Sequence, residues 1–374
     1  MIHIAYYISG HGYGHAVRSI EVIKALLAQN PYLFFHIRTT APPWFFSLNL
    51  KNSFVYEHCE IDVGTMQHDF SEVDIPATYE RVSALFAQKT EIVAREVRLL
   101  KEKQIELVVG DIPPLAFAAA EAARLPSVAI GNFSWDWIYE KFIEMERGFR
   151  ELITQIRVSY RKADVLLRLP MYGEMDAFRH IIDVPLVARK AQRRVKDVRH
   201  TLRLPEGARM VLVAMRLADL HRVQLDNVTA DKRNRIVVIN QNSPIAGVQN
   251  LPEGLLPFQE LVNAADVVVS KPGYGIVSEC LINQTPLIFT ERKDFCEYPI
   301  LVEAIEKYGI GQFIELNQFF AGRWQSAIEN ALKREISADQ VMNHGAAVAA
   351  NHIISLLVKG SVASDAREPT LMSD

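Results

Sequence analysis

Two histidines in a glycine-rich loop are the first residues of this sequence that can do chemistry. Residues 10–15 read GHGYGH and directly follow a short apolar run. An imidazole can take a proton from a hydroxyl near neutral pH, and a tight turn by itself does not need one. Hydrogen bonding within the loop explains either His11 or His15 alone. The pair, placed after a strand, favours a site for general-base chemistry.

The glycines of this loop, Gly12 and Gly14 among them, suit a ligand that carries phosphates. Glycine lets backbone N–H groups approach a ligand closely, and the N-terminus of the helix that follows has positive partial charge. The spacing G-x-G-x-G does not match the G-x-G-x-x-G dinucleotide fingerprint. Arg38 also ends the second predicted strand, where that fingerprint calls for an acidic residue. The loop is therefore a weak dinucleotide signal.

A second junction of strand, glycine turn and helix lies at residues 265–279, ADVVVSKPGYGIVSE. The turn contains Ser270, Lys271, Gly273, Tyr274 and Gly275. Amides at the start of the helix suit a diphosphate, and Glu279 on its first turns suits the vicinal hydroxyls of a ribose. An ordinary turn with a surface glutamate explains one such loop. Two of them, one in each half of the chain, favour ligand binding.

Three further stretches place polar side chains after predicted strands. The loop 291–299, ERKDFCEYP, can hydrogen-bond sugar hydroxyls, although a solvated loop is the better explanation without the neighbouring motif. Asp111 follows a buried strand, where it can act as a second base or orient His15. The stretch 131–142, GNFSWDWIYEKF, forms either a sugar platform on the acceptor side or buried packing. Its candidate residues are Asn132, Trp135 and Asp136.

Strands and helices alternate along the chain, which predicts an α/β protein with parallel sheets. The expected strands are 2–9, 32–40, 53–61, 105–111, 126–132 and 163–170, then 208–215, 235–242, 267–271 and 285–291. The expected helices include 16–30, 78–103, 113–124, 256–266, 272–284 and 299–309. We expect two Rossmann-like, doubly wound domains that face each other across a cleft, where ligands bind by default.

The domain boundaries follow from this alternation. Residues 1–188 form the expected N-terminal domain, residues 189–345 form the C-terminal domain, and a helix at 346–359 can cross back to the first domain. The polar tail 360–374 is expected to be disordered. The stretch 189–203 has seven Lys or Arg and one Asp. It is interpreted as the start of an interdomain connection, either a solvated charge run or a basic rim for a phosphate-bearing ligand.

Composition limits the partners and the compartment. The chain has 374 residues and a formal net charge of -3, so nucleic acid is not an expected partner. Three scattered cysteines fit neither a disulfide framework nor a zinc site, so we expect a reducing, cytoplasmic setting and no metal. No run reaches the roughly 18 apolar residues of a spanning helix. The apolar patch 41–50 is explained more simply by burial than by peripheral contact with a membrane or a lipid acceptor.

Two segments resemble GT-B glycosyltransferases of the group that includes family 28, such as the N-acetylglucosaminyltransferase that completes lipid II and the plastid galactolipid synthases. SGHGYGHAVRS resembles the N-terminal glycine loop of that group, and PFQELVNAADVVVSKPGYGIVSECLINQTPLIF resembles its donor-binding signature. GHGYGHA, DIPPLAF and NFSWDWIYE resemble more closely the glycosyltransferase-like N-terminal module of plant L-arabinokinase and related bacterial proteins. The resemblance covers roughly residues 1–345.

The resemblance implies an inverting, metal-independent hexosyltransferase without a cofactor. Its substrates would be a nucleotide sugar, most simply a UDP-sugar, and the hydroxyl of a glycan, lipid or small-molecule acceptor. His15 matches the loop histidine that acts as base or positioner, and Glu279 matches the glutamate that holds the ribose. The other donor-side positions are Phe258, Ser270, Lys271, Gly273, Tyr274, Gly275, Ser278, Asp294, Phe295 and Glu297. His11 joins Asn132, Trp135 and Asp136 on the acceptor side.

One stretch departs from the pattern of the group. The strand 208–215 ends in Met215-Arg216-Leu217, where members commonly have a pair of glycines near the donor phosphates. A side chain there crowds a pyrophosphate, although Arg216 can instead pair with it. Two alternatives to a transferase therefore stay open. They are a non-catalytic module that binds nucleotide sugars and a sugar-nucleotide epimerase.

Overall fold

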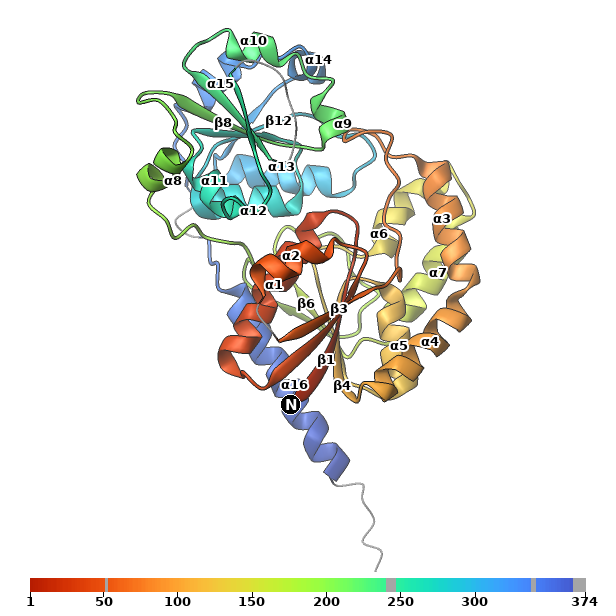
Figure 1. The fold of residues 1–374 in the computed structure, drawn as a ribbon. Helices are drawn as coiled ribbons and strands as arrows, with labels where there is room; N and C mark the ends of the chain where they lie inside the picture. The colour runs from red at the N-terminus through yellow and green to blue at the C-terminus, as the bar shows by residue number, and fades with distance from the viewer. Residues whose placement is uncertain (51–52, 240–246, 338–340, 366–374) are drawn as a thin grey trace, which may run out of the picture. The chain divides into compact units, whose positions relative to one another are not determined.

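The computed structural model describes residues 1–50, 53–239, 247–337 and 341–365. The chain divides into two compact units (Figure 1). The first unit comprises Met1–Thr65, Ile75–Val187 and the C-terminal residues from His344, and the second comprises Met66–Asp74 and Ala188–Asn343. Each unit is built on one parallel sheet. The prediction of two α/β domains with parallel sheets is therefore confirmed.

The sheet of the first unit has the strand order β3-β2-β1-β4-β5-β6-β7, and every pairing is parallel. Its strands are β1 (Ile2–Ile8), β2 (Leu33–Thr39), β3 (Phe54–His58), β4 (Ile105–Asp111), β5 (Ser127–Gly131), β6 (Val165–Arg168) and β7 (Ile181–Asp183). The chain order reverses between β1 and β4. In such sheets ligands bind beyond the carboxyl ends of the strands at this reversal.

Helices cover both faces of this sheet, with α1 and α16 on one face and α4, α5 and α7 on the other (Figure 1). They are α1 (Tyr13–Gln29), α2 (Pro43–Asn49), α3 (Ile75–Ala87), α4 (Lys89–Glu102), α5 (Pro114–Ala123), α6 (Trp135–Glu140), α7 (Phe149–Tyr160) and α16 (Gly345–Asp365), with a short 3-10 helix at Lys141–Glu144. The single helix predicted at 78–103 is wrong. The structure has two helices there, α3 and α4, which are separated at Gln88.

Helix α16 belongs to the first unit and packs against α1. Ala349, Ala350 and Ile353 are fully buried, and the two alanines allow the helices to approach closely. The helix continues to Asp365, so the first residues of the predicted disordered tail are helical. Residues 366–374 of that tail lie outside the described residues.

The apolar patch 41–50 folds largely into helix α2. Phe45 and Phe46 are buried, whereas Leu48 is exposed. Proline at the first helical position suits the start of this helix, because its missing N–H has no intrahelical partner there. None of the described helices has the length and apolar character needed to cross a membrane.

The sheet of the second unit has the order β10-β9-β8-β11-β12-β13, again all parallel. Its strands are β8 (Arg209–Ala214), β9 (Asn234–Ile239), β10 (Val248–Leu251), β11 (Val267–Ser270), β12 (Leu287–Phe289) and β13 (Gly311–Phe313). Its helices are α8 (Val195–Thr201), α9 (Leu217–Leu220), α10 (Leu225–Thr229), α11 (Phe258–Ala264), α12 (Tyr274–Asn283), α13 (Glu297–Lys307), α14 (Leu316–Phe320) and α15 (Gln325–Ala331). The order reverses between β8 and β11. Residues 240–242 of the predicted strand 235–242 lie outside the described residues.

Residues 66–74 lie in the N-terminal half of the sequence but belong to the second unit. This segment is called the strap below. Its residue Phe70 is fully buried in the core of that unit. The ring lies 5.6 Å from each of the rings of Phe319 and Phe320, measured between centroids. These residues fall within the predicted N-terminal domain 1–188, since nothing in their own sequence identifies a distant partner.

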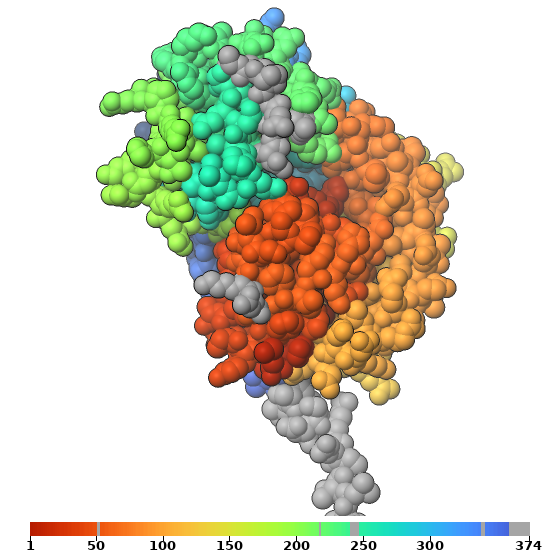
Figure 2. Space-filling model, viewed as in Figure 1, coloured from red at the N-terminus to blue at the C-terminus, as the bar shows by residue number. Residues whose placement is uncertain are grey.

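The basic stretch 189–203 is more than a connection, because it contains α8 and side chains that build the second unit. Arg199 donates to the carbonyl of Ala264 and to Asp266 over 3.1 and 3.0 Å. Arg194 is exposed and pairs with Asp197. Figure 2 shows this stretch, in yellow-green, at the surface of the second unit.

Candidate functional site

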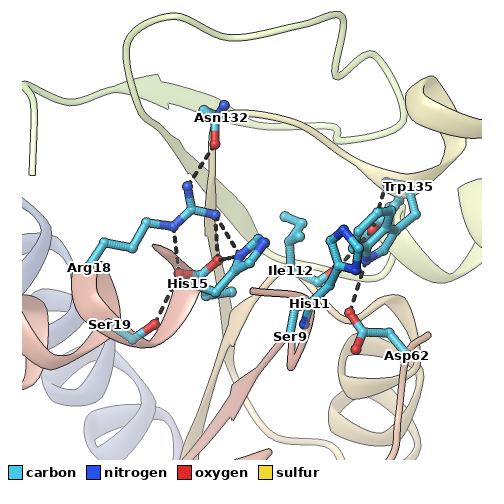
Figure 3. Close-up of polar contacts among 11 residues, drawn as sticks. Ser9, His11, His15, Arg18, Ser19, Asp62, Ile112, Asn132 and Trp135 are labelled. Carbon is cyan, nitrogen blue, oxygen red and sulfur yellow. Dashed lines mark hydrogen bonds and ion pairs between the residues drawn. The ribbon is translucent and has the colours of Figure 1, made fainter. Parts of the chain in front are cut away.

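The glycine loop of the first unit places His15, which Figure 3 shows with Arg18 and Asn132, beside Asp111. Gly12 has φ 84°, a left-handed conformation that glycine adopts without strain, and α1 begins at the next residue. His15 therefore lies in the first turn of α1, and Asp111 is the last residue of β4. Both are at the strand reversal of the first sheet. The Nδ1 atom of His15 lies 2.8 Å from Oδ1 of Asp111.

The Asp111 carboxylate accepts a bidentate ion pair from Arg18. The Nε and Nη2 groups of Arg18 donate to Oδ2 and Oδ1 over 2.7 and 2.6 Å, and the hydroxyl of Ser19 donates to Oδ2 over 3.0 Å. Burial opposes the ionisation of Asp111, but Arg18 and His15 outweigh it and lower the pKa of Asp111 to about 2. Asp111 is thus a charged group with no exposed surface. Of its two predicted roles, orienting His15 fits this geometry, and that of a second base does not.

This network assigns the tautomer of His15. Nδ1 lies within bonding distance of Asp111 and also 3.0 Å from Nη2 of Arg18, which itself donates to the same carboxylate oxygen. A carboxylate accepts, so a neutral His15 carries its proton on Nδ1 and has its lone pair on Nε2. The ring is 6% exposed and makes an edge contact with Phe133. A buried carboxylate thus orients the imidazole, an arrangement in which a histidine can act as a base.

Asn132 lies behind this pair and is fully buried. Its Oδ1 atom accepts from Nη1 of Arg18 over 2.7 Å, so it holds the arginine that holds Asp111. Asn132, which was predicted on the acceptor side, thus has its side-chain oxygen bonded inside the first unit. Arg18 and Ser19 were missed in the sequence. The available signal was their spacing of three and four residues from His15, which places the three side chains close together on a helix.

The predicted sugar platform is packed into the first unit. Trp135 is 2% exposed and donates from Nε1 to Asp62 over 2.9 Å, and His11 meets its ring edge-on (Figure 3). Asp136 is also buried and accepts from Arg157 over 3.0 Å. These contacts are the ones expected of the packing alternative.

Asp62 is a titratable group of this region that the sequence analysis missed. Burial raises its pKa, although hydrogen bonds from Ser9 and Trp135 and the nearby His15 oppose the rise. His11, the other loop histidine, lies with Nε2 3.2 Å from the hydroxyl of Thr65. The loop that carries Asp62 and Thr65 therefore closes around the glycine loop. No local pattern marked it.

The second candidate region lies at the strand reversal of the second sheet. Ser270 ends β11 and donates to the carbonyl of Ala214, the last residue of β8, over 2.6 Å. Helix α12 starts after Gly273, and a Cβ atom at Gly273 would meet no atom of the described residues within 4 Å. The described residues thus leave space beside Gly273, and a helix N-terminus has N–H groups without intrahelical partners, which is an arrangement that can bind anions.

Three cationic side chains, Arg216, Lys271 and Arg292, gather near this helix start and are called the cationic cluster below. Burial, together with the charges of Arg292 and Arg216, lowers the pKa of Lys271 to about 7. Burial and the charge of Arg216 also lower the pKa of Arg292 to about 9. Arg216 is half-exposed and pairs with Asp219 over 2.8 Å. A bound anion relieves this crowding of positive charge.

Arg292 connects the parts of this region. Its Nη1 donates to the carbonyl of Pro272 over 3.1 Å, and its guanidinium carbon lies 3.3 Å from the centroid of the Phe295 ring. Asp294, between them in sequence, is exposed and has φ 59°, a left-handed conformation that aspartate tolerates. Glu297 is half-buried and begins α13.

Glu279, the predicted ribose ligand, lies buried on α12. Its Oε1 atom accepts from Nε of Arg189 over 2.5 Å, and the Arg189 guanidinium lies 6.0 Å from the centroid of the Phe258 ring. The structure therefore brings Phe258 and Glu279, both predicted on the donor side, together through Arg189. Ser278 is buried on the same helix, as is Tyr274. Within the described ranges, no three His, Cys, Asp or Glu side chains gather as a metal site.

Comparison with curated proteins finds an L-arabinokinase from Arabidopsis thaliana. It is 30% identical over 371 residues, which cover 96% of this chain and 35% of the relative. This chain thus spans about a third of the length of the relative that it matches. No protein-family model matches the chain.

Solved structures with this fold include several glycosyltransferases. A UDP-glucosyltransferase from Polygonum tinctorium has a TM-score of 0.60 at 13% identity, covering 96% of this chain and 98% of that one. The kitacinnamycin glycotransferase has a TM-score of 0.58 at 16% identity, covering 97% and 98%. VinC, a glycosyltransferase solved with DTDP, has a TM-score of 0.56 at 13% identity, covering 96% and 100%. The chain therefore has the GT-B fold.

The pKa of Asp111 predicts how stability depends on pH. Since it is about 2 in the fold against an ordinary 3.8, the ionised carboxylate stabilises the protein above about pH 4 by about 2 kcal/mol, and this is lost as pH falls toward 2. Asp111→Asn leaves Arg18 buried without its carboxylate, so we expect a loss of about 3–5 kcal/mol at pH 7. Urea unfolding of both proteins from pH 7 to pH 3 should show the difference narrowing; a constant difference contradicts this account.

Proposed function

We propose that this protein is an inverting, metal-independent glycosyltransferase, of the group with family 28, that moves a hexose from a nucleotide sugar to an acceptor hydroxyl. One observation carries the proposal. The strand reversal of one GT-B unit has a histidine oriented by a buried carboxylate, and that of the other has a cationic cluster beside a helix N-terminus. Base and anion site are the two requirements of this reaction.

The donor binds to the second unit in this proposal. The amides of the α12 N-terminus and the cationic cluster hold the diphosphate, and Glu279 holds the ribose. Asp294 and Glu297, on the loop after β12, hydrogen-bond the sugar. UDP is the nucleotide that the family resemblance favours, and a UDP-glucosyltransferase shares the fold.

The chemistry then needs one proton acceptor and one stabilised leaving group. Nε2 of His15 accepts the proton of the acceptor hydroxyl while its oxygen bonds to the anomeric carbon. The bond between that carbon and the diphosphate oxygen breaks on the opposite face, and the diphosphate leaves with the electron pair. Asp111 stabilises the imidazolium, and Lys271 with Arg292 stabilises the new negative charge.

The setting of the reaction follows from the cysteines. Cys59, Cys280 and Cys296 are free thiols buried in the fold. Free thiols persist in a reducing compartment, so we propose a cytoplasmic enzyme. The chemical class of the acceptor, whether glycan, lipid or small molecule, is for an acceptor screen to establish.

A non-catalytic module that binds nucleotide sugars is the second candidate function. Arg216 favours it, because a long side chain stands where members of the group have glycine, and its pairing with Asp219 holds it near the turn. Donor binding without transfer or hydrolysis across a broad acceptor panel would identify such a module.

Nucleotide binding is the first test of the proposal. We expect thermal unfolding of the full chain to shift upward with one of UDP, dTDP, GDP, CDP or ADP, and the shift to persist with EDTA. A ligand at about 100 times its Kd stabilises the native state by about 2.7 kcal/mol, which is readily visible. No shift with any of the five contradicts the donor site, and a shift abolished by EDTA contradicts metal independence.

The base assignment predicts a specific kinetic defect. His15→Ala should lower the turnover number by about 10²–10⁴-fold, the usual contribution of a positioned base. Its Kd for the nucleoside diphosphate should stay within about twofold of wild type, because His15 does not contact the donor in this proposal. Initial rates and calorimetric titration measure the two effects. His180→Ala, at an exposed histidine, is the matched control. Unchanged turnover in His15→Ala would refute the assignment.

The lowered pKa of Lys271 predicts a pH-dependent affinity. Since that pKa is about 7 without ligand, Lys271 must take up a proton when an anion binds at higher pH. We therefore expect the affinity for the nucleoside diphosphate to fall by about tenfold between pH 7 and pH 8.5. Lys271→Arg, which stays charged throughout, should flatten this dependence. Calorimetric titration checks both proteins, and equal pH profiles would exclude Lys271 as the titrating group.

A further inference from the structure

The strap, residues 66–74, forms a small hairpin with a rigid tip. Gln67 pairs with Val73 in an antiparallel bridge, and the amide of Asp74 donates to the carbonyl of Met66 over 2.9 Å. At the tip, Oδ1 of Asp69 accepts from both the amide and the hydroxyl of Ser71, over 2.7 and 2.6 Å. A turn closed by its own side chains keeps its carbonyl groups in fixed directions.

The tip is anchored in the second unit by one aromatic side chain. Phe70 is fully buried among the apolar residues of that core, between Phe319 and Phe320. Its amide donates to Asp219 over 3.3 Å. Arg222 pairs with Asp69 and also lies over the Phe320 ring, at 4.3 Å from its centroid. A ring buried this deeply contributes strongly to stability, so the tip has one defined position.

Two carbonyls of this anchored tip face the candidate donor site. The carbonyl of Phe70 accepts from Nε of Arg292 over 2.8 Å, and the carbonyl of Ser71 accepts from the amide of Lys293 over 2.7 Å. Arg292 is the same side chain that bonds Pro272 and stacks on Phe295. Both a member of the cationic cluster and the loop that follows β12 are therefore braced by the strap.

We propose that the strap is a positioning element of the donor site. It holds the guanidinium of Arg292 and the loop 291–297 in the geometry that binds the diphosphate and sugar of a nucleotide sugar. The proposal rests on the proposed function for the identity of that ligand. Its physical basis is that Arg292 lies close to the like charges of Lys271 and Arg216. Without fixed acceptors, repulsion would turn this side chain away from the cluster.

The negative charge of the strap allows a further test, because electrostatics and positioning predict opposite changes in anion affinity. Asp69 is the strap's acidic group at the tip, and its negative charge acts to raise the pKa of Lys271. At pH 6, where Lys271 stays largely protonated, Asp69→Asn removes only a negative charge that repels the bound anion, so electrostatics alone predicts tighter binding. The positioning role predicts the reverse, because Asp69→Asn weakens the Ser71 turn and the pair with Arg222. The two effects have opposite signs and one measurement separates them.

The experiment uses the full chain and three variants of the strap. We expect Phe70→Ala to speed hydrogen exchange at the Lys293 amide by about tenfold and to weaken binding of the matching nucleoside diphosphate by about tenfold. Phe70→Leu keeps an apolar anchor and should restore most of both. Glu72→Gln removes an exposed charge from the same strap, so it is the matched control and should leave both within about twofold.

The outcomes distinguish failure of the strap proposal from failure of the proposed function. If wild type binds none of the five nucleoside diphosphates, the proposed function fails, and exchange at Lys293 still reports whether the strap braces the loop. If wild type binds and a folded Phe70→Ala matches it in both measurements, the strap proposal is overturned. Should Phe70→Ala not fold, Asp69→Asn decides at pH 6. Weaker binding supports positioning, and equal or tighter binding overturns it.

Discussion

The ion pair between Arg18 and Asp111 is the interaction on which the histidine site depends. A carboxylate with no exposed surface is costly unless it is paired and hydrogen-bonded, and Arg18 supplies two of the bonds that Asp111 receives. The pair connects α1 to the end of β4, and Asn132 extends it to the residue after β5. Because Asp111 also accepts from His15, the same charge that joins these elements sets which nitrogen of the imidazole is basic. One buried charge therefore both joins these elements and orients the imidazole.

The two units share one sheet topology but differ in how charge is balanced at the strand reversal. In each, the strand order reverses between the first and the fourth strand, and a glycine turn leads into a helix at that point. The first unit compensates its buried charge completely at this position. The second leaves cations crowded, which lowers the pKa of Lys271 and of Arg292. Such crowding of like charge is electrostatically unfavourable by itself, and an anion bound beside it would relieve the repulsion.

The sequence was most informative where cause and effect are local. Glycine turns between a strand and a helix gave both strand reversals, since a parallel α/β order places such turns at one edge of the sheet. Trp135 shows the limit, because a sugar platform and a packed interior need the same aromatic side chains. Asp62 and Phe70 show a second limit of prediction from the sequence. Each acts on partners distant in the sequence, and no spacing rule links Phe70 to Phe319. The interruption of the helix predicted at 78–103 also had no glycine or proline to mark it.

The strap and α16 make both units discontinuous in the sequence, and this governs the order in which the chain can fold. During synthesis Phe70 emerges long before Phe319 and Phe320, so its ring stays without a core until α14 has been made. The first unit in turn lacks α16 until residues 345–365 have followed the whole second unit. The first unit therefore cannot be completed until the whole of the second has been synthesised. Such long-range closure slows folding and leaves apolar surface exposed meanwhile, which makes the nascent chain a natural client for chaperones.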